Sequence, residues 1–390
     1  MAEPTAAPPW LHAPDLAAQK YAEATAAAAM ACAEDTKGQT CYICTEAVHW
    51  KTKEGLVRMC ACRGTAGFAH VSCLAEQAKI LVAEAEENNL DDAQRWSRWH
   101  SCGLCEQDYH GVVRCALGWA CWKTYVGRPD MDRRRMNAMT PLGNGLYGAN
   151  HYEDALSVQE AQMSMLRRFA ASEDAIFIAQ NNLAGTYQKL GRIADAGRLR
   201  QEVYFGWLKL LGEEHESTLT SAANYAVSLV NLGRFEEARP LLREVIPVAR
   251  RVLGNSHELS LSMRLVYAAT LCSVDEMWEA VTMLEETART ARHVLGGAHP
   301  TTKAIEAALR EARAAPFFRS LVYFGGSAVA AAYWKSCEKT EDAISAVFVG
   351  ILFGGMALYI AALGVAIAWN VKGFPILKIP RDHWLTRKYF

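Results

Sequence analysis

The sequence lacks an excess of charge of either sign and a high content of proline and glycine. Its 390 residues hold 41 lysines and arginines against 42 aspartates and glutamates, which excludes the strongly basic balance of a dedicated nucleic-acid-binding protein. The 12 prolines and 27 glycines are too few for a collagen-like or largely disordered chain. Apolar residues make up 51% of the chain, so packed cores are possible, and the length indicates two or three domains.

Cysteine is unevenly distributed, because seven of the twelve cysteines lie between positions 41 and 105. No signal peptide precedes them, so we expect a reducing compartment rather than a disulfide scaffold. Their spacing is C-x2-C, C-x-C, H-x2-C and C-x2-C, which is typical of metal ligands. Thiolate and imidazole donors suit Zn²⁺, and two closed four-ligand sites are structural rather than catalytic. The predicted ligands are Cys41, Cys44, Cys60, Cys62, His70, Cys73, Cys102 and Cys105.

The ligand order and the string CACRGTAGFAHVSCL resemble the RING-CH (MARCH-type) finger of membrane-associated ubiquitin ligases. The resemblance implies a cross-brace, in which the first and third ligand pairs hold one Zn²⁺ and the second and fourth pairs hold the other. It also implies that a ubiquitin-conjugating enzyme docks at Ile43, Trp96 and Trp99. No catalytic side chain is needed, because such a finger acts by positioning the ubiquitin thioester.

Two other interpretations of the finger stay open. A PHD finger, which reads histone tails, shares the order of ligands. Here one residue separates Cys60 from Cys62 and seven separate Cys62 from His70, which favours RING-CH over PHD. The second interpretation is a finger that binds zinc without conjugating ubiquitin, because Glu106 follows the last ligand where an active RING often has a basic residue.

Residues 137–312 repeat at an offset of 42 positions. The triplet Leu-Gly-Arg at 190–192 superposes on 232–234, and Leu-Gly at 211–212 superposes on 253–254. Apolar residues at helical spacing, interrupted by these Leu-Gly pairs, predict about four stacked helix pairs. The motifs NNLAGTYQKLGR and NYAVSLVNLGRFEEA resemble tetratricopeptide repeats of the kinesin light chain type. The resemblance implies an α-solenoid that holds a protein substrate on its concave face.

Long uncharged runs are confined to the last part of the chain. Residues 344–369 carry no charge, and residues 317–334 carry only Arg319. Because about 20 apolar residues cross a bilayer, we expect a transmembrane helical hairpin over 316–370, with a single span as the alternative. The positive-inside rule then places both termini, including a basic tail over 371–390, in the cytosol of a multi-pass membrane protein.

The sequence therefore predicts a mainly α protein with successive domains. An Ala- and Pro-rich leader covers 1–36, the zinc finger 37–115, a linker 116–136 and the solenoid 137–312, before the hairpin and tail. The main functional hypothesis is a membrane-anchored ubiquitin ligase that docks a conjugating enzyme on its finger and recruits substrate through its repeats. The alternative is a non-enzymatic adaptor that resembles kinesin light chains. Neither hypothesis includes a nucleic-acid partner.

Overall fold

The computed structural model describes residues 11, 13–90, 93–273, 276–297 and 299–313. These residues form helices α1–α12, a 3₁₀-helix η2 and a further helical segment over 300–313, so the chain is mainly α, as predicted. The described ranges contain no strand, only two isolated β-bridges. The chain divides into two compact units, of which one ends at Leu210 and the other begins at Leu211.

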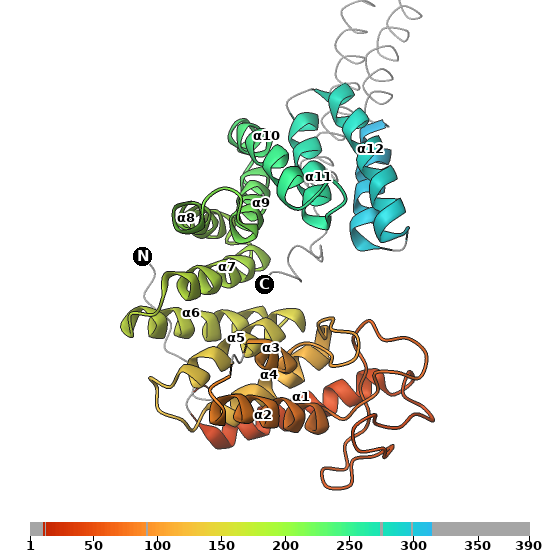
Figure 1. Ribbon diagram of the computed structural model, residues 1–390, viewed down its shortest axis with the longest axis vertical. Helices are drawn as coiled ribbons and strands as arrows, with labels where there is room; N and C mark the ends of the chain where they lie inside the picture. Colours follow the sequence, from red (N-terminus) through yellow and green to blue (C-terminus); the bar gives the residue numbers. More distant parts are fainter. Residues whose placement is uncertain (1–10, 12, 91–92, 274–275, 298, 314–390) are drawn as a thin grey trace, which may run out of the picture. The chain divides into compact units, whose positions relative to one another are not determined.

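Helix α4 is the centre of the amino-terminal part of the first unit. Helices α1, α2 and α5 all pack against it, and η2 contacts it as well (Figure 1). Most side chains of α4 are buried, among them Leu117, Trp119 and Trp122. The bounds are α1 Pro14–Cys32, α2 Val71–Glu87, α3 Ala93–Trp96, η2 Ser97–Trp99, α4 Gly111–Tyr125 and α5 Arg133–Gly148.

Two glycines bring the backbones of α4 and α5 into direct contact. A Cβ atom on Gly118 of α4 would lie 2.6 Å from the carbonyl oxygen of Pro141. A Cβ atom on Gly145 of α5 would lie 2.8 Å from the carbonyl oxygen of Arg114. Both distances are too short for a side chain, so only glycine allows this approach at either position.

Residues 116–136, which the sequence predicts as a linker, form most of α4 and the first turn of α5. The charged run that suggested a linker makes ion pairs and a helix cap instead. Arg134 Nε lies 3.1 Å from Glu86 Oε2, which connects α5 to α2. Asp132 accepts the backbone N–H groups of Arg134 and Arg135 and so caps α5. The segment joins the cysteine-rich part and the helices up to Leu210 in one packed body.

The repeats form the predicted helix pairs. The first unit holds α5 with α6 (Tyr152–Arg168) and α7 (Glu173–Lys189) with α8 (Ile193–Leu211). The second unit holds α9 (Glu216–Asn231) with α10 (Phe235–Val252) and α11 (Glu258–Ser273) with α12 (Met277–Leu295). The Leu-Gly-Arg triplet ends the first helix of a pair, because Gly191 and Gly233 have φ values of 80° and 71°. Glycine adopts this left-handed conformation without strain, which explains the period seen in the sequence.

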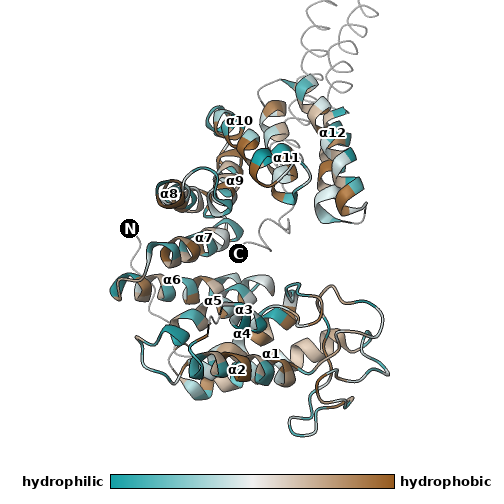
Figure 2. Ribbon diagram, in the orientation of Figure 1, coloured by the Kyte–Doolittle hydropathy of each residue, from teal (hydrophilic) through white to brown (hydrophobic). Residues whose placement is uncertain are grey.

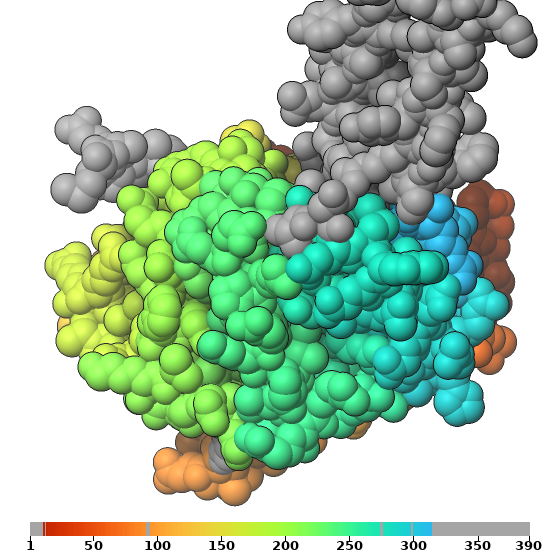
Figure 3. All heavy atoms as spheres, turned by 90° about the horizontal axis from the view of Figure 1, so that it is seen from above, coloured from red at the N-terminus to blue at the C-terminus, as the bar shows by residue number. Residues whose placement is uncertain are grey.

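In the second unit, α9 and α11 are buried on all faces, whereas α10 and α12 bury only one face. The buried side chains of α10 are Ala238, Leu242, Ile246 and Ala249, which recur at helical spacing. In Figure 2, α9–α12 accordingly carry both hydrophobic and hydrophilic residues. The space-filling view shows the side chains of these helices packed against one another along the unit (Figure 3). The unit is thus stabilised by contacts between neighbouring pairs.

The predicted multi-pass membrane localisation is corrected by the structure. Within the ranges given above, no helix combines the length and the apolar composition that crossing a bilayer requires. Long helices such as α8 and α12 carry charged residues, and only part of their apolar side chains is buried between helices. The residues of the expected hairpin, 316–370, lie outside those that the structure describes.

Replacing Gly145 by alanine tests the close approach of α4 and α5. We expect Gly145→Ala to lower the free energy of unfolding by about 1–3 kcal/mol, because the new methyl group overlaps the Arg114 carbonyl. Gly148→Ala is the matched control on the same helix, since its Cβ atom would lie 3.8 Å from the Arg114 side chain. Urea unfolding measures both variants, and equal losses of stability would contradict the proposed role of Gly145.

Candidate metal centre

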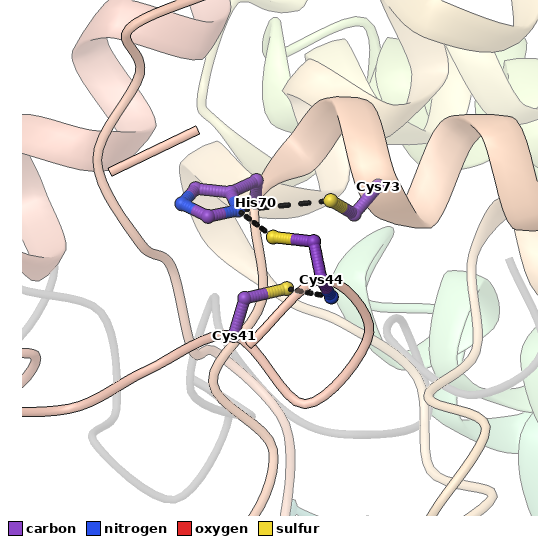
Figure 4. Close-up of side chains that lie close together, drawn as sticks. All are labelled: Cys41, Cys44, His70 and Cys73. Carbon is purple, nitrogen blue, oxygen red and sulfur yellow. Dashed lines mark hydrogen bonds between the residues drawn. The ribbon is translucent and has the colours of Figure 1, made fainter. Parts of the chain in front are cut away.

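The first group of candidate ligands lies at the amino-terminal end of α2 (Figure 4). His70 directly precedes α2 and Cys73 lies in its first turn, while Cys41 and Cys44 come from one loop. The ligand atoms all lie within 4.8 Å of one another. Nδ1 of His70 lies 3.3 Å from Cys44 Sγ and 3.6 Å from Cys73 Sγ, so this nitrogen faces the thiols.

The second group consists of Cys60, Cys62, Cys102 and Cys105, whose sulfur atoms also lie within 4.8 Å of one another. Cys62 Sγ and Cys102 Sγ are 3.7 Å apart, although 40 positions separate them in the chain. Two of these cysteines precede the first group's His70 in the sequence, and the other two follow Cys73. The structure therefore brings together both ligand sets that the resemblance implied, and they alternate along the chain.

Burial and hydrogen bonds between thiols shift the pKa values of these side chains. Burial lowers the pKa of His70, which keeps its imidazole neutral. A hydrogen bond from Cys60 lowers the pKa of Cys102 to about 4, and the same bond raises the pKa of Cys60. Burial raises the pKa of Cys62 to about 11. A metal ion that binds to the second group would therefore displace the protons of the Cys60 and Cys62 thiols.

The donor chemistry fits a metal ion in each group. Soft thiol donors dominate both, with one neutral imidazole in the first. Backbone N–H groups of Ile43 and Cys44 point to Cys41 Sγ at 3.4 and 3.5 Å, and that of Leu104 points to Cys102 Sγ at 3.5 Å. These contacts stabilise negative charge on the sulfur atoms. Each group could therefore hold one metal ion with four protein ligands.

Gly67 is a site residue that the sequence analysis missed. Its φ is +86°, and a Cβ atom there would lie 2.6 Å from Cys62 Cβ and 3.4 Å from Cys60 Sγ. A larger residue would displace Cys62, so glycine is required for the four sulfur atoms of the second group to come together. The signal in the sequence is the pair of glycines, Gly64 and Gly67, between the C-x-C and H-x2-C pairs, in a segment too short for a helix.

Two carboxylates, also missed, hold the ligand loops against helices. Glu54 accepts hydrogen bonds from the backbone N–H of Ser72, at 2.8 Å, and from its hydroxyl, which fixes the start of α2 between His70 and Cys73. Asp108 accepts the hydroxyl of Ser101 at 2.7 Å. Its other oxygen lies 3.5 Å from Arg114 on α4. Both carboxylates therefore position a ligand loop.

The three residues expected to dock a conjugating enzyme differ in exposure. Ile43 is 37% exposed between Cys41 and Cys44, as a docking role requires. Trp99 is 0% exposed, and its ring lies 5.9 Å from that of Tyr125 in the core around α4. Trp96 is partly buried and stacks on the same tyrosine at 5.5 Å. An apolar residue that the sequence analysis missed, Leu104, is 52% exposed between Cys102 and Cys105.

Replacing Gly67 by alanine tests whether the second group needs glycine at this position to bring its four sulfur atoms together. We expect the Gly67→Ala chain to hold half as much metal after dialysis as the wild type, because the new Cβ atom displaces Cys62. Gly64→Ala is the matched control, since Gly64 also has a positive φ, +61°, but no atom lies within 4 Å of its Cβ position. Elemental analysis measures both variants, and equal metal contents would contradict the requirement for glycine at position 67.

Comparison with known proteins identifies the repeats. The tetratricopeptide repeat family matches residues 175–251 and 220–293, so this part of the chain carries tetratricopeptide repeats. No curated protein matches the chain.

Similar solved structures include repeat proteins of the kinesin light chain type. A putative kinesin light chain of Podosopora anserina with nearly identical TPR-like repeats is 19% identical, with a TM-score of 0.40 over 57% of this chain and 97% of that one. A variant of the same protein has a TM-score of 0.41 at the same identity and coverage. BtubC (BKLC) from P. vanneervenii is 13% identical, with a TM-score of 0.40 over 63% of this chain and 90% of that one.

Proposed function

We propose that this protein is a non-enzymatic adaptor, in which helical repeats bind a protein partner and an amino-terminal zinc module completes the scaffold. The observation that carries this proposal is the match of residues 175–293 to tetratricopeptide repeats, together with the helix pairs that they form. Repeats of this kind present extended surfaces built from successive helices, and such surfaces bind other proteins.

Exposed apolar side chains on the repeats are the candidate contacts. Trp278, on α12 of the second unit, is 85% exposed, and Phe205, on α8 of the first unit, is 52% exposed. Large exposed aromatic side chains cost solubility, and tryptophan is enriched among the residues that dominate binding at protein interfaces. We therefore expect Trp278 and Phe205 to contact the partner.

The metal in both groups is Zn²⁺ in this proposal. Seven thiolates and one imidazole suit zinc better than magnesium or calcium, which prefer oxygen ligands. Four protein ligands per ion leave no coordination position for water or substrate, so zinc would hold the loops in place. The protein supplies no acid, base or nucleophile to it.

Ubiquitin transfer is a second candidate function, and one observation favours it. The two ligand groups alternate along the chain, and each presents an exposed apolar residue, Ile43 or Leu104, between two of its cysteines. A conjugating enzyme could dock on these side chains. Against activity, Glu106 places an acidic residue directly after the last ligand.

A partner-binding measurement tests the adaptor proposal. Cross-linking to the full chain first identifies a partner. We expect the affinity of that partner to fall about tenfold or more when Trp278→Ala or Phe205→Ala is introduced, as for a central interface contact. Met30→Ala is the control, since Met30 is 78% exposed on α1, outside the repeats. Unchanged affinity in both repeat variants would contradict the proposal that these surfaces bind the partner.

A reconstituted ubiquitination assay separates the two candidate functions. With an activating enzyme and a panel of conjugating enzymes, the adaptor proposal predicts no ubiquitin conjugates from the zinc-loaded chain. Conjugates that form with the wild type and are lost with Ile43→Ala would establish the ligase instead. Elemental analysis of the same sample shows whether both chains are zinc-loaded.

A further inference from the structure

We propose that metal in the second ligand group controls the folding of the first solenoid helices, α5–α7, through α4. This inference rests on the proposed metal binding and concerns how the proposed partner-binding scaffold is regulated. When the second group loses its metal, α4 loses its attachment at one end and the helices packed on it open. A partner bound to these helices would then be released.

Both loops of the second group are attached to the start of α4. The backbone N–H of His110 donates to the carbonyl of Met59, at 3.0 Å, and Met59 directly precedes Cys60. On the other loop, the N–H of Tyr109 donates to the carbonyl of His100 at 2.8 Å, two residues before Cys102. The Asp108 carboxylate described above joins the same loop to Arg114. The second group therefore fixes the first turn of α4.

The first group is attached to α2. His70 and Cys73 belong to the start of α2, and α2 reaches α4 through side-chain packing. The two groups also differ in burial. The second group has three partly exposed ligands and one buried ligand, Cys102, whereas the first group has three buried ligands and one partly exposed ligand, Cys44. A chelator in solution therefore reaches the second group first.

A movement of α4 would also move α5, because the backbones of the two helices are in direct contact. The backbone contacts at Gly118 and Gly145 leave no room for α5 to keep its position if α4 moves. Helix α5 is joined to α6 by a hydrogen bond from Gln162 to Thr140 at 2.7 Å. Helix α6 is joined to α7 by one from Thr186 to Gln159 at 2.6 Å, between buried side chains. The path from the second group to α7 thus consists of close or buried contacts.

Hydrogen–deuterium exchange of the full chain tests this coupling. The test variant is Cys105→Ser, which removes a ligand of the second group, and Cys44→Ser removes a ligand of the first. Cys32→Ala is the control, because Cys32 is a buried thiol of the same part of the chain that belongs to neither group. We expect Cys105→Ser to speed amide exchange in α4–α7 by about tenfold or more, and Cys44→Ser to do so mainly in the loops and α2. Exchange in α11 of the second unit stays unchanged and shows that the variants fold.

The proposal is overturned if exchange in Cys105→Ser rises only in the ligand loops while α4–α7 stay protected. It is also overturned if the wild-type chain contains no metal, or if a chelator leaves the exchange of α4–α7 unchanged. If Cys105→Ser does not accumulate as a folded chain, amide exchange in α4–α7 is compared between the wild type with and without a chelator. No partner takes part in the experiment, so a failure of this coupling is distinguishable from a failure of the adaptor function.

Discussion

The convergence of eight soft ligands into two groups is the constraint on which the amino-terminal part of the molecule depends. The loops between α1 and α2, and between η2 and α4, have no strand among their described residues and only two isolated bridges. Segments with so little regular structure and so small a core need cross-links to hold one conformation. The ligand groups supply these cross-links, because each joins loops that lie far apart in the sequence.

The same constraint extends into the repeats. Helix α4 begins shortly after Cys105, the last ligand of the second group, and packs against α1, α2 and α5. Because α5 is the first helix of the first pair, the module and the repeats share one packed body up to residue 210. The two ligand groups and the helices α5–α7 therefore belong to one body and are not separated by a flexible tether.

Sequence spacing predicted the features that are set by local geometry. The spacing of the cysteines and His70 along the sequence predicted two four-ligand groups, and the structure brings these residues together. That they hold zinc is a proposal. The offset of 42 residues predicted the helix pairs, because Gly191 and Gly233 end helices at a fixed position in each copy.

Features that depend on tertiary contacts could not be predicted from the sequence. Residues 116–136 look like a linker because of their charges, but Arg134 and Asp132 pair or cap within a packed interface. Trp99 looks like a docking residue from its position, yet its burial against Tyr125 depends on where α4 lies. The contribution of Gly67 likewise becomes visible only when Cys62 lies beside it.

X-ray absorption at the zinc edge of the purified full chain tests the central claim most directly. The account predicts two zinc ions per chain, with seven sulfur donors at about 2.3 Å and one nitrogen donor at about 2.0–2.1 Å shared between them. A chain that contains no zinc, or zinc surrounded mainly by oxygen and nitrogen, would contradict it.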